Sequence, residues 1–296
     1  MFIKDVGEIV GLNVLKDEQM KRRTAFGVGG NADYFIEALS LHSLSALVEK
    51  AKEKRIKYKV LGLGSNVLIS DDGFRGLIIS IRRLNDVYFK RDNVRAMAGA
   101  HLEKLIKFNL EHKLTGLEAL SGLPATVGGA VVMNAGAFGR SISDNLIEVE
   151  TLKNGKIKKY AKNECDFSYR SSRFLHKKEI IVAATFNFES LDGEVISERE
   201  KIYLELRKSK QPLGRSCGSV FKNPVGKNAG ELIEKAGLKG YTIGGASVSE
   251  KHANFILTTS KATAKDVYSL ILHIKDKVQK EFGVILQEEV EYLGEF

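Results

Sequence analysis

Residues 58–69 read YKVLGLGSNVLI, with two apolar runs on either side of the sequence Gly-Leu-Gly-Ser-Asn at 62–66. Short apolar runs bounded by glycine are typical of strands, so this stretch predicts a strand, a tight turn and a second strand. A Rossmann dinucleotide site needs a G-x-G-x-x-G turn that leads into a helix. Here the third glycine is absent and a strand follows, so Rossmann-type binding of a nicotinamide cofactor is disfavoured.

A glycine turn of this kind can bind a diphosphate by another route. Successive main-chain N–H groups in a tight turn form a concave anion site, and each hydrogen bond to a charged oxygen contributes about 1.5–3 kcal/mol. The side chains of Ser65 and Asn66 would add further donors. Taken alone, the stretch is more simply interpreted as an ordinary tight hairpin, because glycine is common in turns.

A second glycine-rich segment covers residues 116–139, where small side chains dominate. Such a segment would let a flat ring or a phosphate lie directly on the main chain, since glycine allows close approach. It could equally be a close-packed helix crossing. The two glycine segments together favour a large nucleotide cofactor.

Three further segments carry side chains that could serve a site. Arg170 lies in YRSSR at 169–173, and its guanidinium could fork a carboxylate, although most arginines are at the surface. Ser219 follows a glycine in SCGSVFKNP at 216–224, without the G-x-S-x-G elbow of a serine hydrolase. In LQEEV at 286–290, strand alternation would send Glu288 and Glu289 to opposite faces.

The composition is that of an ordinary globular protein. The chain has 296 residues, of which 43% are hydrophobic and 28% charged, which argues against a disordered, collagenous or coiled-coil protein. No apolar run reaches the roughly 18 residues of a spanning helix, and the first ten residues lack a signal-peptide core. We therefore expect a cytoplasmic protein. Its two cysteines and six histidines show no metal-ligand spacing, so no metal site is expected.

The net charge of +9 could favour nucleic acid, a membrane surface or a small anionic substrate. The densest basic stretches, 52–59 and 153–162, are interpreted as solvated surface. A nucleic-acid-binding protein would combine basic residues on one face with stacking aromatics. The aromatics here are scattered and tryptophan is absent, so we expect neither a nucleic-acid nor a membrane partner.

The pattern along the chain divides near residue 190. Before it, short strand candidates alternate with a few helices, of which 43–54 and 101–111 are the clearest. After it, residues 194–210 predict a charged helix, Ser260 is expected to cap a long helix, and 289–293 predict a final strand. The class is α+β with two domains.

Taken together and in order, these segments resemble the UDP-N-acetylenolpyruvoylglucosamine reductase family, flavoenzymes that make UDP-N-acetylmuramate for peptidoglycan. The resemblance runs from residue 24 to residue 290. Its strongest matches are GLGSN at 62–66, SGLPATVGG at 121–129 with NAG at 134–136, YR at 169–170 and GSVFKNP at 218–224.

The resemblance implies a two-lobed FAD-binding domain of the vanillyl-alcohol-oxidase (PCMH) type at 1–192, with lobes of about 1–82 and 83–192. A smaller α/β substrate-binding domain would follow at 193–296. Residues 27–30 would support the first lobe. The residues implied to bind FAD are Gly62, Leu63, Gly64, Ser65, Asn66, Ser121, Gly122, Pro124, Thr126, Gly128 and Gly129.

The activity implied is NADPH-dependent reduction of the enolpyruvyl ether of UDP-N-acetylglucosamine, with FAD as cofactor and the chain acting as a monomer. The resemblance places the catalytic roles on Arg170 and Glu289, which would stabilise an enediolate, and on Ser219, which would donate the proton. Substrate contacts are expected from Tyr169, Arg170, Lys222 and Asn223.

The spacing of the three catalytic positions resembles the family's shorter class, which lacks an inserted segment whose tyrosine closes over the substrate diphosphate. Lys222, Asn223 and Arg215 are candidates for that role. Ala125 replaces a usual glycine, and the sequence Gln-Glu-Glu at 287–289 replaces Glu-Pro-Glu. A flavin enzyme that oxidises an alcohol or sugar lactone is the main alternative, but it would often tether FAD through a histidine, and neither FAD segment contains one.

Overall fold

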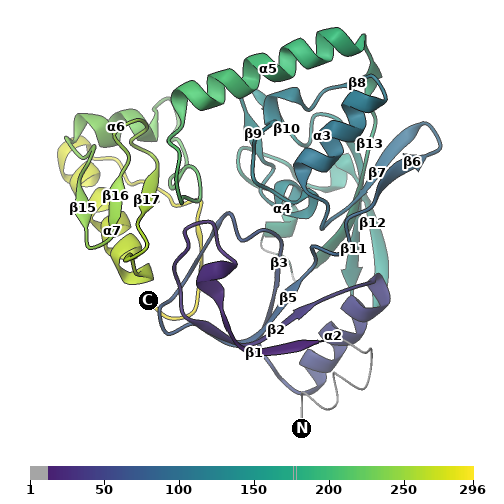
Figure 1. Cartoon of the computed structure of the whole chain (residues 1–296), viewed down its shortest axis with the longest axis horizontal. Coiled ribbons are helices and arrows are strands. Elements are labelled where there is room, and N and C mark those ends of the chain that lie inside the picture. The colour runs from purple at the N-terminus through teal and green to yellow at the C-terminus, as the bar shows by residue number, and fades with distance from the viewer. Residues whose placement is uncertain (1–12, 176, 178) are drawn as a thin grey trace. The chain divides into compact units, whose positions relative to one another are not determined.

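The computed structural model describes residues 13–175, 177 and 179–296, and these group into two compact units (Figure 1). The described part of the first unit comprises 13–15, 35–62, 77–175, 177 and 179–207, and the second comprises 16–34, 63–76 and 208–296. Each unit is therefore assembled from separate stretches of chain. The division into domains 1–192 and 193–296 stays a prediction.

The first unit is built around a five-stranded antiparallel sheet with the order β12-β11-β13-β7-β6. Its strands are β6 (Val87–Lys90), β7 (Asn93–Met97), β11 (Leu146–Lys153), β12 (Lys156–Ala161) and β13 (Ile180–Phe186). The short helix α4 (Val127–Val132) packs on β7 and β13, and α3 (Leu102–Glu111) packs beside α4 (Figure 1). The predicted helix at 101–111 is confirmed.

A second sheet has four strands in the order β1-β2-β5-β3. The strands are β1 (Val14–Gln19), β2 (Asn31–Glu37), β3 (Tyr58–Leu61) and β5 (Phe74–Ser80). β3 and β5 are parallel, with Tyr58 opposite Leu77. A parallel pair requires a long crossover, and here residues 62–73 provide it. This connection contains the glycine turn and the short strand β4 (Val67–Ile69).

Helix α2 (Leu41–Glu53) begins two residues before the predicted helix. Ser40 caps it: the Ser40 hydroxyl accepts a hydrogen bond from the N–H of Ser43, and the Ser43 hydroxyl accepts one from the N–H of Ser40. This reciprocal capping box satisfies two main-chain donors and sets the start of the helix. The apolar face buries Leu44, Leu47 and Val48.

The second unit combines α7 (Ala264–Phe282) and α6 (Ala229–Lys235) with small sheets. Strands β15 (Thr242–Ile243), β16 (Ala246–Val248) and β17 (Ile256–Thr258) are antiparallel, whereas β18 (Glu291–Leu293) pairs in parallel with β4. The predicted long helix is confirmed as α7, and its apolar face buries Val267, Leu270, Ile271, Ile274 and Val278 in the core of this unit.

The predicted cap of that long helix is wrong. α7 starts after Thr263 rather than after Ser260. The Thr263 hydroxyl accepts from the N–H of Asp266 at 3.1 Å, and the Asp266 carboxylate accepts from the N–H of Thr263 at 3.0 Å. This reciprocal pair satisfies two main-chain donors and sets the start of α7 at Ala264.

The remaining elements are short, apart from helix α5 (Gly193–Lys210). They are η1 (Met20–Arg22), β8 (Leu114–Thr115), η2 (Glu118–Leu120), β9 (Gly136–Ala137), β10 (Arg140–Ser141), η3 (Lys162–Glu164), η4 (Arg173–Leu175) and β14 (Glu189–Ser190). The mixture of helices and strands confirms the predicted α+β class. None of the helices in the described part of the chain is long and apolar enough to cross a membrane.

Candidate active site

The glycine turn at 62–66 is not a hairpin. β3 pairs with β5, whereas β4, which follows the turn, pairs with β18 near the C-terminus. The two strands that flank the turn therefore lie in different sheets, and the hairpin interpretation is wrong. Residues 62–66 therefore connect two sheets and do not themselves pair with a strand.

The main-chain N–H groups of this turn are open donors. Those of Leu63, Gly64 and Ser65 donate to no protein acceptor within the described residues. Gly64 is nevertheless buried, has a φ of +65°, and would bring a Cβ onto the main-chain oxygen of Arg23. A buried N–H without a partner is costly, so this turn fits an anionic ligand such as the diphosphate of FAD.

Asn66, at the end of the turn, faces the C-terminal segment. Its side-chain amide donates to the main-chain oxygen of Glu289 at 2.8 Å, and its own main-chain oxygen accepts from the N–H of Glu291 at 3.0 Å. The predicted flavin turn is thus tied to the predicted catalytic glutamate. A donation from the Asn66 side chain to FAD stays a prediction.

The structure also brings the segments of Ser219 and Glu289 together. The N–H of Glu289 donates to the oxygen of Val220 at 2.8 Å, and the N–H of Lys222 donates to the oxygen of Gln287 at 2.8 Å. Ser219 itself forms an isolated bridge with Phe255, after Gly218 at a φ of +82°. Two predicted catalytic residues therefore lie on adjacent segments of the second unit.

The neighbouring glutamates differ in their surroundings. Glu288 is paired with Lys275 of α7 at 2.7 Å. Glu289 is half-buried. The pKa of the Cys217 thiol is raised by the burial of that thiol and by the negative charge of Glu289. Cys217 precedes Ser219 by two residues in the same segment.

Asn254 holds the Ser219 segment, and sequence reasoning missed it. Its side-chain oxygen accepts from the N–H of Phe221 at 2.9 Å, and its amide donates to the oxygen of the same residue at 2.8 Å. The predicted substrate residue Asn223 accepts from the N–H of Ala229, at the start of α6, at 3.0 Å. Polar residues beside buried strands were the available signal for such anchors.

In the first unit, Gly62 and Thr126 lie in contact. A Cβ on Gly62 would meet the Thr126 hydroxyl, which caps α4 by accepting from the N–H of Gly129 at 3.2 Å. The N–H of Gly128 donates to the oxygen of Ala98 at 2.8 Å. Gly128 also lies close against Ala98, so part of the predicted FAD segment is close-packed against the protein.

Helix α5 fixes the other end of that segment. Arg207 donates to the main-chain oxygens of Ser121 at 2.8 Å and Ala119 at 3.3 Å, and the Ser121 hydroxyl donates to Glu200 at 3.0 Å. Gly122 has a φ of +78°, and a Cβ there would lie 3.1 Å from Cδ of Arg207. The sequence did not indicate these anchors. Pro124 lies within the same loop, between Leu123 and Ala125, whose main chains are hydrogen-bonded at 2.9 Å.

Arg170 lies in a tight turn of the first unit. The turn is closed by Ser168 and Ser171, and Arg170 has a φ of +52°. Its guanidinium carbon is 5.2 Å from the centre of the Tyr169 ring, and Tyr169 is 54% exposed. A cation on an exposed ring is suited to a ligand that brings negative charge.

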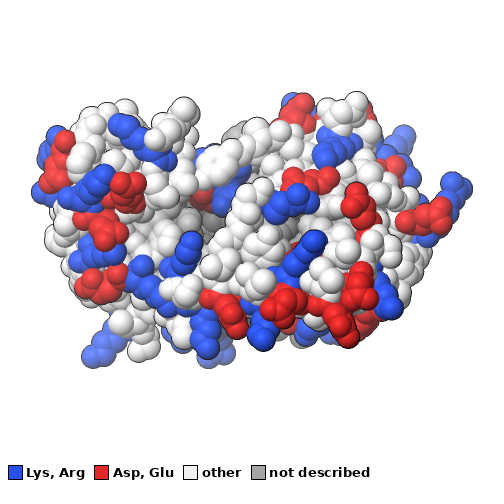
Figure 2. Space-filling view, turned by 90° about the horizontal axis from the view of Figure 1, so that it is seen from above, with Lys and Arg blue, Asp and Glu red and all other residues white. Residues whose placement is uncertain are grey.

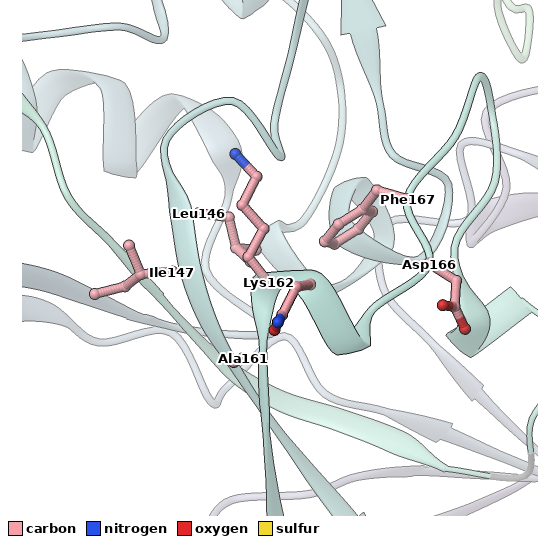
Figure 3. A pocket seen from close by; sticks show the side chains of 7 residues that line it. Leu146, Ile147, Ala161, Lys162, Asp166 and Phe167 are labelled. Atoms are coloured by element: carbon pink, nitrogen blue, oxygen red, sulfur yellow. The ribbon is translucent and has the colours of Figure 1, made fainter.

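A hollow of about 640 Å³ on the first unit contains none of these residues (Figure 3). Leu146, Ile147, Ala161, Lys162, Asn163, Asp166 and Phe167 line it. Lys162 donates to the main-chain oxygen of Asp144 at 3.0 Å. None of the predicted site residues lines this hollow, so the hollow is not assigned to the reaction.

Comparison with known proteins gives two domain matches. Residues 209–293 match the C-terminal domain of UDP-N-acetylenolpyruvoylglucosamine reductase, and residues 32–160 match an FAD binding domain. The UDP-N-acetylenolpyruvoylglucosamine reductase of Carboxydothermus hydrogenoformans is 44% identical over 95% of this chain and 94% of its own length.

Solved structures agree with these matches. The crystal structure of UDP-N-acetylenolpyruvylglucosamine reductase from Thermus caldophilus is similar at a TM-score of 0.83 and 34% identity, over 96% of this chain and 99% of that chain. A berberine bridge enzyme variant, a reticuline dehydrogenase, is similar at a TM-score of 0.51 and 14% identity, over 65% of this chain and 44% of that chain. The second likeness shows the fold alone.

An FAD-binding fold with open main-chain donors at a glycine turn defines a flavoprotein oxidoreductase, and the predicted vanillyl-alcohol-oxidase type of fold is confirmed. Within that class, the chain belongs to the UDP-N-acetylenolpyruvoylglucosamine reductase family. The resemblance predicted from the motifs is therefore confirmed. FAD is the cofactor of this enzyme and NADPH the reductant, and the enzyme acts in peptidoglycan precursor synthesis.

Proposed function

We propose that this chain reduces UDP-N-acetylenolpyruvoylglucosamine to UDP-N-acetylmuramate, with its catalytic groups on Arg170, Ser219 and Glu289. The observation that supports this most directly is the hydrogen bond from the Asn66 side chain, at the end of the glycine turn, to the main-chain oxygen of Glu289. The N–H of Glu289 in turn donates to the oxygen of Val220, the residue after Ser219. Bound FAD would supply hydride transfer from NADPH to the terminal methylene carbon of the enolpyruvyl group. The protein must then stabilise the negative charge that forms on the substrate and supply a proton to it.

Arg170 has the chemistry needed to hold the substrate carboxylate. Negative charge builds on the carboxylate and its neighbouring carbon once the methylene carbon has received hydride. A planar guanidinium binds two oxygens at once, and its attraction grows as the charge grows, which lowers the barrier. The exposed Tyr169 ring beside it would help to orient the guanidinium.

Ser219 would deliver the proton to the carbon next to the carboxylate. A hydroxyl is a weak acid, so it can donate only to a strongly basic acceptor, and an enediolate is one. A positioned acid of this kind contributes about 10²–10⁴-fold to the rate. The bridge with Phe255 and the Asn254 hydrogen bonds to Phe221 support a fixed position for this hydroxyl.

Glu289 would hold the enediolate through a shared proton, which requires a protonated carboxyl. Glu289 is half-buried, and its N–H donates to the oxygen of Val220, next to Ser219. Lys222, Asn223 and Arg215 would serve the substrate diphosphate. Arg215 already packs against Gly27, where a Cβ would lie 2.8 Å from its Cδ.

The experiment that tests these roles separates the two half-reactions by following flavin absorbance in stopped flow. In Ser219→Ala, bleaching by NADPH should continue at the wild-type rate, whereas reoxidation by the enolpyruvyl substrate should fall by about 10²-fold or more. Equal loss of both half-reactions would refute the proton-donor role.

We also propose that the chain works as a monomer in the cytoplasm, where NADPH and nucleotide sugars are available, without a nucleic-acid or membrane partner. On the face in Figure 2, Lys and Arg are interspersed with Asp and Glu rather than gathered in one stripe. Nucleic-acid binding would favour such a stripe. Sedimentation at several protein concentrations would test the monomer.

A further inference from the structure

The turn that carries Arg170 is strained and must be held in place. Ser168 and Ser171 exchange two main-chain hydrogen bonds of 3.1 Å each, which leaves Tyr169 and Arg170 as its two central residues. Arg170 has a φ of +52°, a left-handed conformation that costs a residue with a side chain about 1–2 kcal/mol. Strain of this kind persists only where the surroundings impose it.

Two side-chain hydrogen bonds impose it, one at each end of the turn. The side-chain amide of Asn134 donates to the main-chain oxygen of Ser168 at 2.9 Å, before Arg170. The Ser172 hydroxyl donates to the main-chain oxygen of Val132 at 2.7 Å, after Arg170. Both side chains belong to buried residues, with 8% exposure for Asn134 and 3% for Ser172. The turn is therefore tied at both ends to the C-terminal end of α4.

The same stretch of chain also makes room for the guanidinium. Gly136, two residues after Asn134, would place a Cβ 3.3 Å from Nη1 of Arg170 and 2.7 Å from the main-chain oxygen of Arg140. Any larger residue would press on the arginine. Asn134 itself has a φ of +43°, which asparagine tolerates better than most residues.

We infer that Asn134 and Ser172 are positioning residues that aim the guanidinium of Arg170 at the substrate carboxylate. The inference rests on the proposed function of Arg170. A displacement of a reacting group by about 1 Å can cost about 10²-fold in rate, and neither end of this turn can shift without breaking one of the two bonds.

The test uses variants of the full-length holoenzyme that remove one hydrogen bond each. Asn134→Asp keeps the size and the tolerance for positive φ but replaces the donating amide with a carboxylate oxygen. Ser172→Ala removes the hydroxyl, and Ser172→Thr restores it. The matched control is Asn145→Asp in the same unit, because Asn145 also donates to a main-chain oxygen, that of Asn187 at 3.3 Å, and also has a buried side-chain oxygen without a partner among the described residues.

The readout is the rate of each half-reaction, with the melting temperature measured alongside. Asn134→Asp and Ser172→Ala should slow reoxidation by the enolpyruvyl substrate about 10- to 100-fold and leave bleaching by NADPH within about twofold. Ser172→Thr should recover most of the rate, and Asn145→Asp should change neither half-reaction. In an Arg170→Lys background, Asn134→Asp should add less than about threefold, because residues that act through one group are not additive.

Three results would overturn the inference. The first is equal slowing of both half-reactions in Asn134→Asp and in Ser172→Ala. The second is that Asn134→Asp slows reoxidation by the same factor in the wild-type and in the Arg170→Lys background. The third is normal reoxidation in both single variants while reoxidation in Arg170→Lys is slow. Failure of the proposed function has a different signature, namely normal reoxidation in Arg170→Lys itself. Ser172→Ala keeps the test decisive if Asn134→Asp does not fold.

Discussion

The side-chain amide of Asn66 donates a hydrogen bond to the main-chain oxygen of Glu289 at 2.8 Å. The two residues are far apart in sequence. A second bond joins the same two segments, because the N–H of Glu291 donates to the oxygen of Asn66 at 3.0 Å. Beyond them β4 and β18 run in parallel, with Val67 opposite Glu291. The turn proposed to bind the flavin diphosphate and the segment of the proposed catalytic carboxyl are therefore one structural piece.

Replacing Asn66 should therefore affect both stability and the second half-reaction. In Asn66→Ala the Glu289 oxygen loses a partner, which should lower the free energy of unfolding by about 1–3 kcal/mol. Reoxidation by substrate should slow by about tenfold because Glu289 is less firmly held. Urea unfolding and stopped flow measure the two effects. Thr242→Ala, which removes an exposed hydrogen bond to Gly240, is the control, and an equal effect there would contradict the role of Asn66.

Gly64 offers a test of the flavin turn itself. Gly64→Ala places a Cβ on the main-chain oxygen of Arg23 at a φ of +65°, whereas Gly226→Ala, at a φ of +67°, meets nothing within 4 Å. Both variants carry the same backbone strain, about 1–2 kcal/mol, but only the first distorts the open donors. We expect FAD affinity to fall by about tenfold or more in Gly64→Ala, since one lost hydrogen bond to a charged oxygen is enough for that. Flavin release measured by fluorescence should be unchanged in Gly226→Ala.

The pair Glu288 and Glu289 gives a matched test of the carboxyl. Glu289→Gln should slow reoxidation by about 10²-fold or more, because an amide cannot share the proton in the same way. Glu288→Gln loses the ion pair with Lys275, at 2.7 Å, and should keep its rate, since partly exposed pairs contribute little. Stopped flow with the enolpyruvyl substrate distinguishes them. Similar rates in the two variants would remove Glu289 from the mechanism.

The sequence predicted local structure well where a single stretch carries its own signals. The turn at 62–66 and the apolar face of α7 follow from residue pattern alone. The pairing of β4 with β18 could not be predicted, because strand pairing between distant segments leaves no local trace. For that reason the hairpin interpretation of the turn was wrong.

The candidate residues were predicted by resemblance, but their anchors were not. Asn134 and Asn254 hold the segments of Arg170 and Ser219 through main-chain groups, and an asparagine that bonds to a distant carbonyl looks in sequence like any loop residue. α5 was expected to open the C-terminal domain. Its Arg207 holds the main chain at Ala119 and Ser121, a contact that follows only from the three-dimensional packing.

A buried ion pair in the sheet of the first unit predicts how stability depends on pH. Arg95 forks Glu150 with two bonds of 2.8 Å and also donates to the Tyr88 hydroxyl at 2.6 Å. The two side chains are only 10% and 9% exposed. The hydrogen bonds from Arg95 hold the pKa of Glu150 below its ordinary value of 4.5, although burial opposes this.

The folded protein therefore binds the Glu150 proton less readily than the unfolded chain does. The stabilising contribution is complete above the ordinary pKa of 4.5 and is lost as the pH falls through the lower pKa of the folded state. Glu150→Gln leaves a buried guanidinium without its counter-charge, which should lower the free energy of unfolding at neutral pH by about 3–5 kcal/mol. Urea unfolding from neutral to acidic pH should show this gap between wild type and variant closing as Glu150 becomes protonated. Glu231→Gln, which breaks the exposed pair with Lys235 at 2.6 Å, should leave the profile unchanged, and a gap in Glu150→Gln that stays constant with pH would contradict the assignment.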